Sequence, residues 1–308
     1  MLLFAFPFAG ATRVRAAEAP DPRNDQKVKG RLAKAMGKDG VLTAKGVKDL
    51  MDQPAFERVA GPDQRLDPEN VKTAFIDKTP ESRKRLNPKI VAYAEVLATS
   101  FDMIDETHLA EAIGCLRGFT KNYKPGTPLQ ITVIWTGDSR RSTLRSTLGN
   151  IAAVYQGMPE MQFHSGGTAP TAFNPRTIAA LQAIGVEIEP TGTEAPRGEP
   201  KTPNPIYKVR WGAPGQPSLE TTEFSKIYFD ASNPASGFAA SMVCGEADEA
   251  CPLVKGASGR ISMPYLDPKI YEGSSLESLK SAERRDDIGR LTLSVMTRVR
   301  NRLNHSSR

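Results

Sequence analysis

Cysteine is scarce in this sequence, and it has no long apolar runs and no dense clusters of one charge. The 308 residues include three cysteines, so the chain can form at most one disulfide, with one thiol left over. No apolar stretch approaches the roughly 18–20 residues that span a bilayer, so we expect no membrane span. The net charge of +6 is spread along the chain. Its densest basic cluster, Ser82–Arg85, is too short to indicate a nucleic-acid partner.

The first 16 residues have the pattern of a secretory signal peptide. Leu2–Ala11 is a short hydrophobic region, and Val14 and Ala16 are small residues at the −3 and −1 positions before a cleavage site. A basic stretch ahead of the hydrophobic region is missing, but the alternative, an N-terminal core helix, is disfavoured by Pro7. We therefore expect export, to the periplasm. The location is cytoplasmic if this segment is not a signal.

Residues 17–86 form a polar extension that is interrupted by prolines and glycines. The extension includes two short predicted helices around a turn at Lys38–Gly40. This turn is faintly similar to a calcium-binding EF-hand loop, but only Asp39 falls on a carboxylate ligand position, and Gly46 occupies the position of the bidentate glutamate. We expect no metal site here and no cofactor in the chain.

Residues 87–304 carry a regular alternation of helices and strands, and 39% of the whole chain is apolar, which is enough for a core. Two helices come first, one opened by Asn87-Pro88 and one over about residues 105–119, in which Cys115 fills the core. Strands are then predicted over 129–135, 160–166, 186–189 and 238–244, with helices between them, a hairpin near 206–224 and a long final helix. Such alternation predicts an α/β fold with a parallel sheet.

Residues 135–142 have the composition of an anion-binding loop. The first predicted strand ends at Trp135, and the next residues lead into a helix with an arginine in its first turn. Backbone N–H groups around a helix N-terminus converge on an anion, and arginine adds a two-pronged donor. A purely structural loop is the alternative. The residues expected to bind a phosphate-like or arsenate-like oxyanion are Thr136, Gly137, Asp138, Ser139, Arg140, Arg141 and Ser142.

The segment Trp135–Ser142 resembles the Cys-x5-Arg-Ser phosphate loop of the low-molecular-weight tyrosine phosphatases and the related thioredoxin-coupled arsenate reductases. Four later segments resemble, in the same order, that family's second strand and helix, its redox-cysteine segment, its general-acid segment and its closing helix. These are residues 163–188, 238–252, 263–273 and 284–299. The resemblance implies a three-layer flavodoxin-like fold with a small parallel four-stranded sheet, to which the helical extension and an inserted hairpin are added.

Trp135 stands where this family has its nucleophilic cysteine. A thiolate at that position attacks phosphorus or arsenic, whereas an indole has no lone pair suited to the attack. A shift in register does not restore a thiol, because no cysteine lies between residues 116 and 243. Asp138 stands at the family's loop asparagine, where a carboxylate facing the site repels an anion unless Arg140 or Arg141 neutralises it. We therefore expect a pseudoenzyme in which Trp135 fills the nucleophile's pocket.

By the same resemblance, Cys244 and Cys251 occupy the positions of the two further redox thiols, and Asp267 that of the general acid. The two cysteines either form a static disulfide or reduced pair, or exchange with a thioredoxin-like partner. Because Trp135 replaces the loop thiol, no thiol–arsenic adduct forms for Cys244 to attack. Asp267 likewise has no leaving group to protonate. The alternative is an active phosphatase or arsenate reductase with another nucleophile, such as Cys244.

Two further interpretations stay open at this point. His164, beside the turn after the second strand, either contacts the loop or is a satisfied strand-end histidine. The domain can also serve as a scaffold, with residues 17–86 contacting a partner, since these residues resemble nothing in the family.

Overall fold

The computed structural model describes residues 42–43, 65–66, 81–198, 201–215, 219–243 and 253–306. The chain divides into two compact units, Met1–Lys78 and Thr79–Arg308. In the first unit, β1 (Leu42–Thr43) pairs antiparallel with β2 (Arg65–Leu66). The segment predicted as a signal peptide, most of the predicted extension, and both Cys244 and Cys251 lie outside the described residues.

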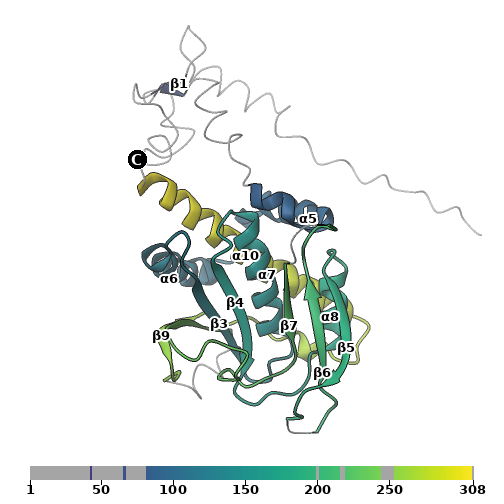
Figure 1. The fold of residues 1–308 in the computed structure, drawn as a ribbon. Coiled ribbons are helices and arrows are strands. Elements are labelled where there is room, and N and C mark those ends of the chain that lie inside the picture. The colour runs from purple at the N-terminus through teal and green to yellow at the C-terminus, as the bar shows by residue number, and fades with distance from the viewer. Residues whose placement is uncertain are drawn as a thin grey trace, which may run out of the picture. The chain divides into compact units, whose positions relative to one another are not determined.

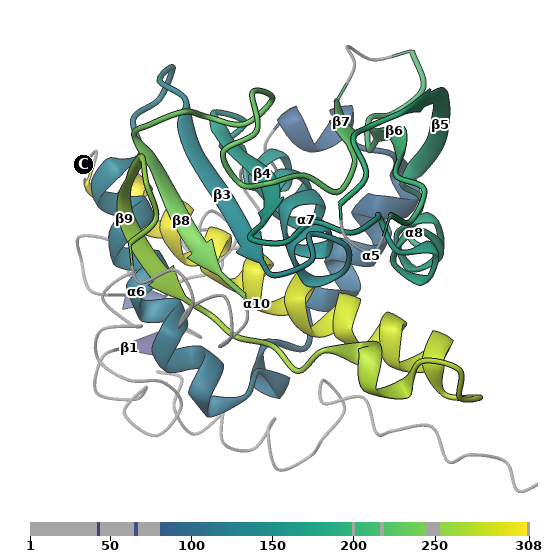
Figure 2. The same cartoon turned by 90° about the horizontal axis from the view of Figure 1, so that it is seen from below.

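The second unit is built on a parallel four-stranded sheet, seen from two directions in Figures 1 and 2. Its strands lie in the order β4 (Met161–Gly167), β3 (Leu129–Trp135), β8 (Phe238–Met242) and β9 (Ala257–Ser262). The chain's second parallel strand thus lies at one edge, beside the first, and the third and fourth follow on the other side. This is the flavodoxin-like order, and it confirms the predicted α/β fold class.

A second, antiparallel sheet is inserted between β4 and β8. It consists of β5 (Glu187–Glu194), β6 (Pro205–Arg210) and β7 (Glu220–Glu223), in that order. The β6–β7 pair confirms the predicted hairpin. The strand predicted over 186–189 is β5, which pairs with β6 and so does not belong to the parallel sheet. The fourth parallel strand, β9, was missed because its mostly exposed residues show no apolar alternation.

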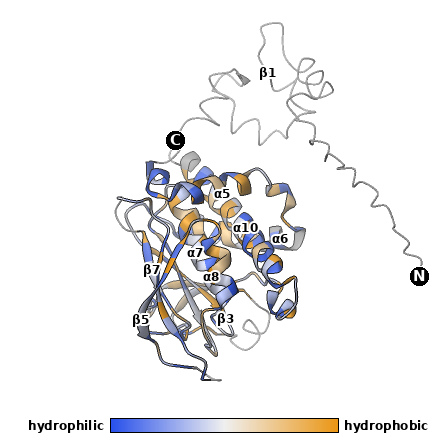
Figure 3. Ribbon diagram, turned by 90° about the vertical axis from the view of Figure 1, so that its right-hand side faces the viewer, coloured by the Kyte–Doolittle hydropathy of each residue, from blue (hydrophilic) through white to orange (hydrophobic). Residues whose placement is uncertain are grey.

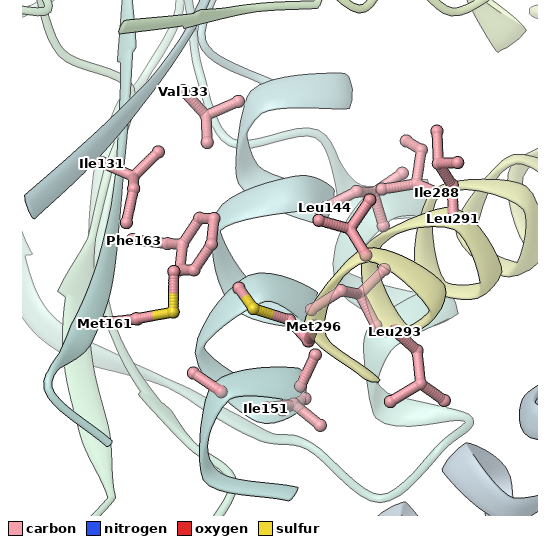
Figure 4. Close-up of a cluster of buried hydrophobic side chains, with 14 of the residues drawn as sticks. Ile131, Val133, Leu144, Ile151, Met161, Phe163, Ile288, Leu291, Leu293 and Met296 are labelled. Carbon is pink, nitrogen blue, oxygen red and sulfur yellow. The ribbon is translucent and has the colours of Figure 1, made fainter. Parts of the chain in front are cut away.

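The core lies where the parallel sheet, α7 (Arg141–Tyr155) and α10 (Glu277–Ser306) meet. Every residue of α7 is buried, and Figure 3 shows hydrophobic residues gathered in α5, α7 and α10. Gly149 lets α7 approach β4 closely, because a Cβ there would lie 2.5 Å from the ring of Phe163. Figure 4 shows the side chains that meet in this cluster, among them Ile131, Phe163, Leu144, Ile151, Leu291 and Met296.

Two of the surrounding helices begin as their sequences predict. The side chain of Asn87 caps α5 (Pro88–Ala98), and that of Asn174 caps α8 (Pro175–Gln182), each followed by proline. Cys115 is buried in the core, as predicted. The remaining helical segments are η2 (Glu81–Arg85), η3 (Phe101–Met103), α6 (Glu106–Asn122) and η4 (Pro268–Tyr271). Within the described ranges, no helix has the length and apolar character to cross a membrane.

Candidate functional site

The loop between β3 and α7 turns its carbonyl groups outward, toward the segment that follows β4. Four backbone hydrogen bonds of 2.8–3.1 Å hold it there. They run from the N–H groups of Thr168, Ala169, Thr171 and Asn174 to the carbonyl oxygens of Trp135, Thr136, Gly137 and Ser139, respectively. These carbonyl groups on the outer side of the loop thereby have hydrogen-bond donors, and the loop is held against the segment 168–174.

The inner side of the loop presents N–H groups. In a trans peptide, the N–H that follows a carbonyl points to the opposite side. The N–H groups of Gly137, Asp138 and Arg140 therefore point away from the segment 168–174. None of these three has a hydrogen-bond acceptor among the described residues. Asp138 has a φ of 41°, the left-handed conformation that closes such a loop. Convergent N–H groups beside a helix N-terminus form an anion-binding concavity.

Trp135 lies across this concavity. Its indole is packed on the start of the loop, since a Cβ on Gly137 would lie 3.2 Å from Trp135 Cζ3. At the other end of the loop, the guanidinium carbon of Arg141 lies 5.0 Å from the centroid of the indole ring. Only 6% of Trp135 is exposed, and its indole N–H has no acceptor in the described part of the chain. The aromatic ring therefore spans the loop from its first residue to its arginine.

Arg141 is held by groups of the protein itself. Its Nη1 donates to the carbonyl oxygens of Tyr265 at 2.6 Å and Val243 at 3.4 Å, and its Nη2 donates to Asp267 Oδ2 at 2.9 Å. The Arg141 and Asp267 side chains are 8% and 18% exposed, so their ion pair is largely desolvated. Asp267 therefore occupies the place on the arginine that a bound oxyanion would use. The predicted loop arginine and the predicted acid are brought together.

Arg140 points to a different carboxylate. Its Nη2 lies 3.3 Å from Oε1 of Glu272, which is about half exposed. Because exposed ion pairs contribute little, this contact restrains Arg140 only weakly. Sequence reasoning missed Glu272, which is distant in the chain and belongs to no recognisable motif.

Asp138 does not face the concavity, so the expectation that its carboxylate would repel a bound anion is wrong. Its Oδ1 accepts from Ser142 Oγ at 2.8 Å, and its Oδ2 accepts from the backbone N–H of Lys226 at 3.0 Å and from Ser165 Oγ at 3.3 Å. The carboxylate is completely buried behind the loop. Asp138 therefore holds the conformation of the loop from the side opposite the concavity. The hydroxyl of Ser142 helps to hold it, because it donates to this carboxylate and not into the concavity.

A buried polar cluster surrounds Asp138, and half of it comes from the end of β7 and the residues directly after that strand. Ser165 Oγ lies between the two carboxylates, 2.9 Å from Glu223 Oε2, so Asp138 and Glu223 share its single hydroxyl proton. Lys226 Nζ lies 3.3 Å from the same Glu223 oxygen. Burial raises the pKa of Asp138 to about 6, although attraction to Lys226 acts in the opposite direction. Glu223 ends β7 and Lys226 follows it, and both were missed because this stretch of sequence has no local signal of a buried site.

Replacing Asp138 with asparagine should remove a pH-dependent loss of stability. The raised pKa means that the folded chain holds a proton between about pH 4 and 6 that the unfolded chain has released, so the contribution of Asp138 falls by roughly 3 kcal/mol as pH rises through this range. Relative to the wild type, Asp138→Asn should gain about that much from pH 4 to pH 7.5, measured by urea denaturation. The exposed control Asp102→Asn should show no such gain. Parallel curves for Asp138→Asn and wild type would contradict the assignment.

The other predicted site residues lie outside the loop or outside the described residues. His164 Nε2 is 2.5 Å from Gln130 Oε1, so His164 is a satisfied strand histidine. Its burial lowers its pKa. Cys244 and Cys251 fall between the described ranges, but Val243, which precedes Cys244, contacts Arg141. Among the described residues, no group of His, Cys, Asp and Glu side chains could hold a metal ion.

Comparison with family models gives no match, and comparison with curated proteins gives none either. Sixteen chains of solved structures match this one, among them the following two. A low-molecular-weight protein tyrosine phosphatase from Bacillus subtilis is 14% identical, with a TM-score of 0.36, over 58% of this chain and 100% of that one. A thioredoxin-dependent arsenate reductase from Corynebacterium glutamicum is 14% identical, with a TM-score of 0.31, over 75% of this chain and 89% of that one. Likeness at this level transfers no residue role to this chain.

Proposed function

We propose that this chain is a phosphatase-like protein that binds a phosphate-like oxyanion at the 135–142 loop with little or no turnover. The observation that carries the proposal is the loop itself. The carbonyl groups before Gly137, Asp138 and Arg140 are bonded outward, and the N–H groups of these residues point inward without acceptors. Such a loop stabilises negative charge whether or not a nucleophile is present.

We expect no turnover because the first residue of the loop is Trp135. Phosphoryl transfer through a covalent intermediate needs a nucleophile there, and Trp135 offers an aromatic ring. The indole instead packs between Gly137 and Arg141, so an anion must displace part of it or bind at its edge. The indole N–H, which has no acceptor in the described structure, is then a further donor to the anion.

Binding also requires Arg141 to exchange one carboxylate for another anion. The oxyanion would take the place of Asp267 on Nη2, while the Tyr265 carbonyl keeps Nη1 in position. We therefore infer a closed resting loop, in which Asp267 substitutes for the ligand, and an open liganded loop. A phosphorylated partner protein and free inorganic phosphate present the same chemistry to this site.

A titration followed by tryptophan fluorescence tests this function. The chain has two tryptophans, so Trp211→Phe leaves Trp135 as the only indole reporter. Phosphate, arsenate and vanadate should each give a saturable change in emission. Each anion should separate the guanidinium of Arg141 from the indole of Trp135 and so change the surroundings of the fluorescent ring. In the same background, Arg141→Ala should weaken binding at least about tenfold, or 1.4 kcal/mol.

The matched control for Arg141→Ala is Arg176→Ala. Arg176 pairs with Glu277 at the surface and touches no residue of the loop among its described contacts. Its replacement should leave the titration unchanged. The proposed function fails if no oxyanion gives a saturable response, or if the response is the same in Arg141→Ala as in Arg176→Ala.

A second candidate function, catalysis by another thiol, is favoured by one observation. The carbonyl of Val243 lies 3.4 Å from Arg141 Nη1, so the chain that leads into Cys244 passes beside the loop arginine. In this alternative the substrate is arsenate. The Cys244 thiolate bonds to arsenic with loss of water, Cys251 then attacks the Cys244 sulfur, and the sulfur–arsenic bond breaks with its electron pair leaving on arsenic as arsenite. The resulting Cys244–Cys251 disulfide is reduced by a thioredoxin-like protein. Activity that is lost in Cys244→Ser would support this candidate.

A further inference from the structure

A pocket of about 260 Å³ lies between the start of α6 and the middle of α10. No residue of the 135–142 loop lines it. Ile104 and Leu291 give the pocket a buried apolar surface, while His108 and two arginines of α10, Arg284 and Arg290, provide its polar lining. The site is therefore separate from the anion-binding loop and has both an apolar and a cationic side.

The two arginines share one carboxylate. Arg284 Nη1 donates to Asp287 Oδ2 at 3.1 Å, and Arg290 Nη1 lies 3.3 Å from Asp287 Oδ1. Both oxygens of Asp287 are thus in use, each by one guanidinium. The arginine side chains are only 13% and 12% exposed, so their positions are well defined. A single carboxylate thereby holds two guanidinium groups at the wall of one pocket.

Two donors of these arginines remain for a ligand. Neither Arg284 Nη2 nor Arg290 Nη2 has an acceptor among the described residues, and neither atom is among the buried polar atoms that lack a hydrogen-bond partner, so both are open to solvent. Each belongs to an arginine that lines the pocket. A guanidinium N–H that is open to solvent and held in position can donate to an oxyanion that enters the pocket.

We propose that this pocket binds a small organic anion. The carboxylate or phosphate group of the ligand accepts hydrogen bonds from Arg284 and Arg290, and its apolar part lies on Ile104 and Leu291. Asp105 also lines the pocket, so the charges of the lining balance. Selection therefore rests on the unused donors and not on net charge.

Isothermal titration calorimetry on the full chain tests the site with three probes that share a phenyl ring: benzoate, phenyl phosphate and neutral benzamide. At least one anion should bind with a Kd below about 10 mM, and benzamide should bind at least about tenfold more weakly. Preference for benzoate or for phenyl phosphate tells which anionic group the site takes. Saturable binding of neither anion would overturn the proposal.

Two variants of α10 decide where the anion binds. Arg284→Gln should weaken binding at least about tenfold, whereas Arg298→Gln, which changes an exposed arginine of the same helix, should not change it. If circular dichroism shows that Arg284→Gln does not fold, Arg290→Gln replaces it with the same expectation. Equal anion affinities in the α10 pocket variant and in Arg298→Gln would overturn the proposed site. The heat of binding would then come from another place, such as the 135–142 loop.

Discussion

Trp135→Cys should convert the protein into a phosphatase. The inward N–H groups of Gly137, Asp138 and Arg140 would lower the pKa of a thiol at the head of the loop, as a helix N-terminus does for reactive cysteines. The thiolate can then attack phosphorus. Asp267, within reach of the site through its contact with Arg141, can protonate the leaving oxygen, and water releases phosphate from the phosphocysteine.

The expected gain is large because a missing nucleophile usually removes nearly all turnover. Hydrolysis of p-nitrophenyl phosphate should rise on the order of 10³-fold or more over the unmodified chain. Trp135→Ser is the matched control, since it removes the same indole without supplying a thiol, and it should bind phosphate but not hydrolyse the ester. A folded Trp135→Cys that binds phosphate and has no activity would mean that the rest of the site is not catalytically competent.

Asp267→Asn should bind oxyanions more tightly than the wild type. In the resting protein the Asp267 carboxylate lies 2.9 Å from Arg141 Nη2 and must leave before an anion can take its place. An amide removes both the competing charge and its repulsion of the ligand. We expect affinity for phosphate to rise at least about tenfold, which corresponds to 1.4 kcal/mol, in the fluorescence titration.

The same variant should lose stability without ligand, because removing one partner of a largely buried ion pair leaves the other uncompensated, at a cost of about 3–5 kcal/mol. Phosphate should restore much of this loss, since a ligand that binds only the folded state stabilises it. Glu272→Gln, which removes the half-exposed partner of Arg140, should change affinity less than about threefold. Weaker phosphate binding in Asp267→Asn would contradict the idea that Asp267 substitutes for the ligand.

Much of the domain was predictable from local sequence patterns. The β-branched run that ends at Trp135 specifies β3, and the asparagine-proline pairs at Asn87 and Asn174 specify where α5 and α8 begin. The setting of the 135–142 loop was also predictable, because a loop between a strand and a helix places N–H groups at a helix N-terminus. Each of these features depends on residues that are close in sequence.

The parts that could not be predicted depend on contacts between distant residues. Nothing in the sequence around Glu223 and Lys226 indicates that they surround Asp138, about 85 residues earlier, and without that contact Asp138 was expected to face the anion. Likewise, β9 is defined by its parallel pairing with β8 and not by an apolar pattern of its own. The Arg141–Asp267 ion pair was not predicted either, because family resemblance assigned a role to each residue but no contact between them.

We propose that the 135–142 loop binds an oxyanion but lacks a nucleophile, because Trp135 stands at the nucleophile's position. The most direct test is one measurement on the unmodified chain: release of p-nitrophenol from p-nitrophenyl phosphate, at concentrations of this ester that saturate the fluorescence change. No rate above that of buffer is expected while the site is occupied. A rate that scales with protein concentration and disappears in Cys244→Ser would contradict this proposal and identify an active enzyme with a different nucleophile.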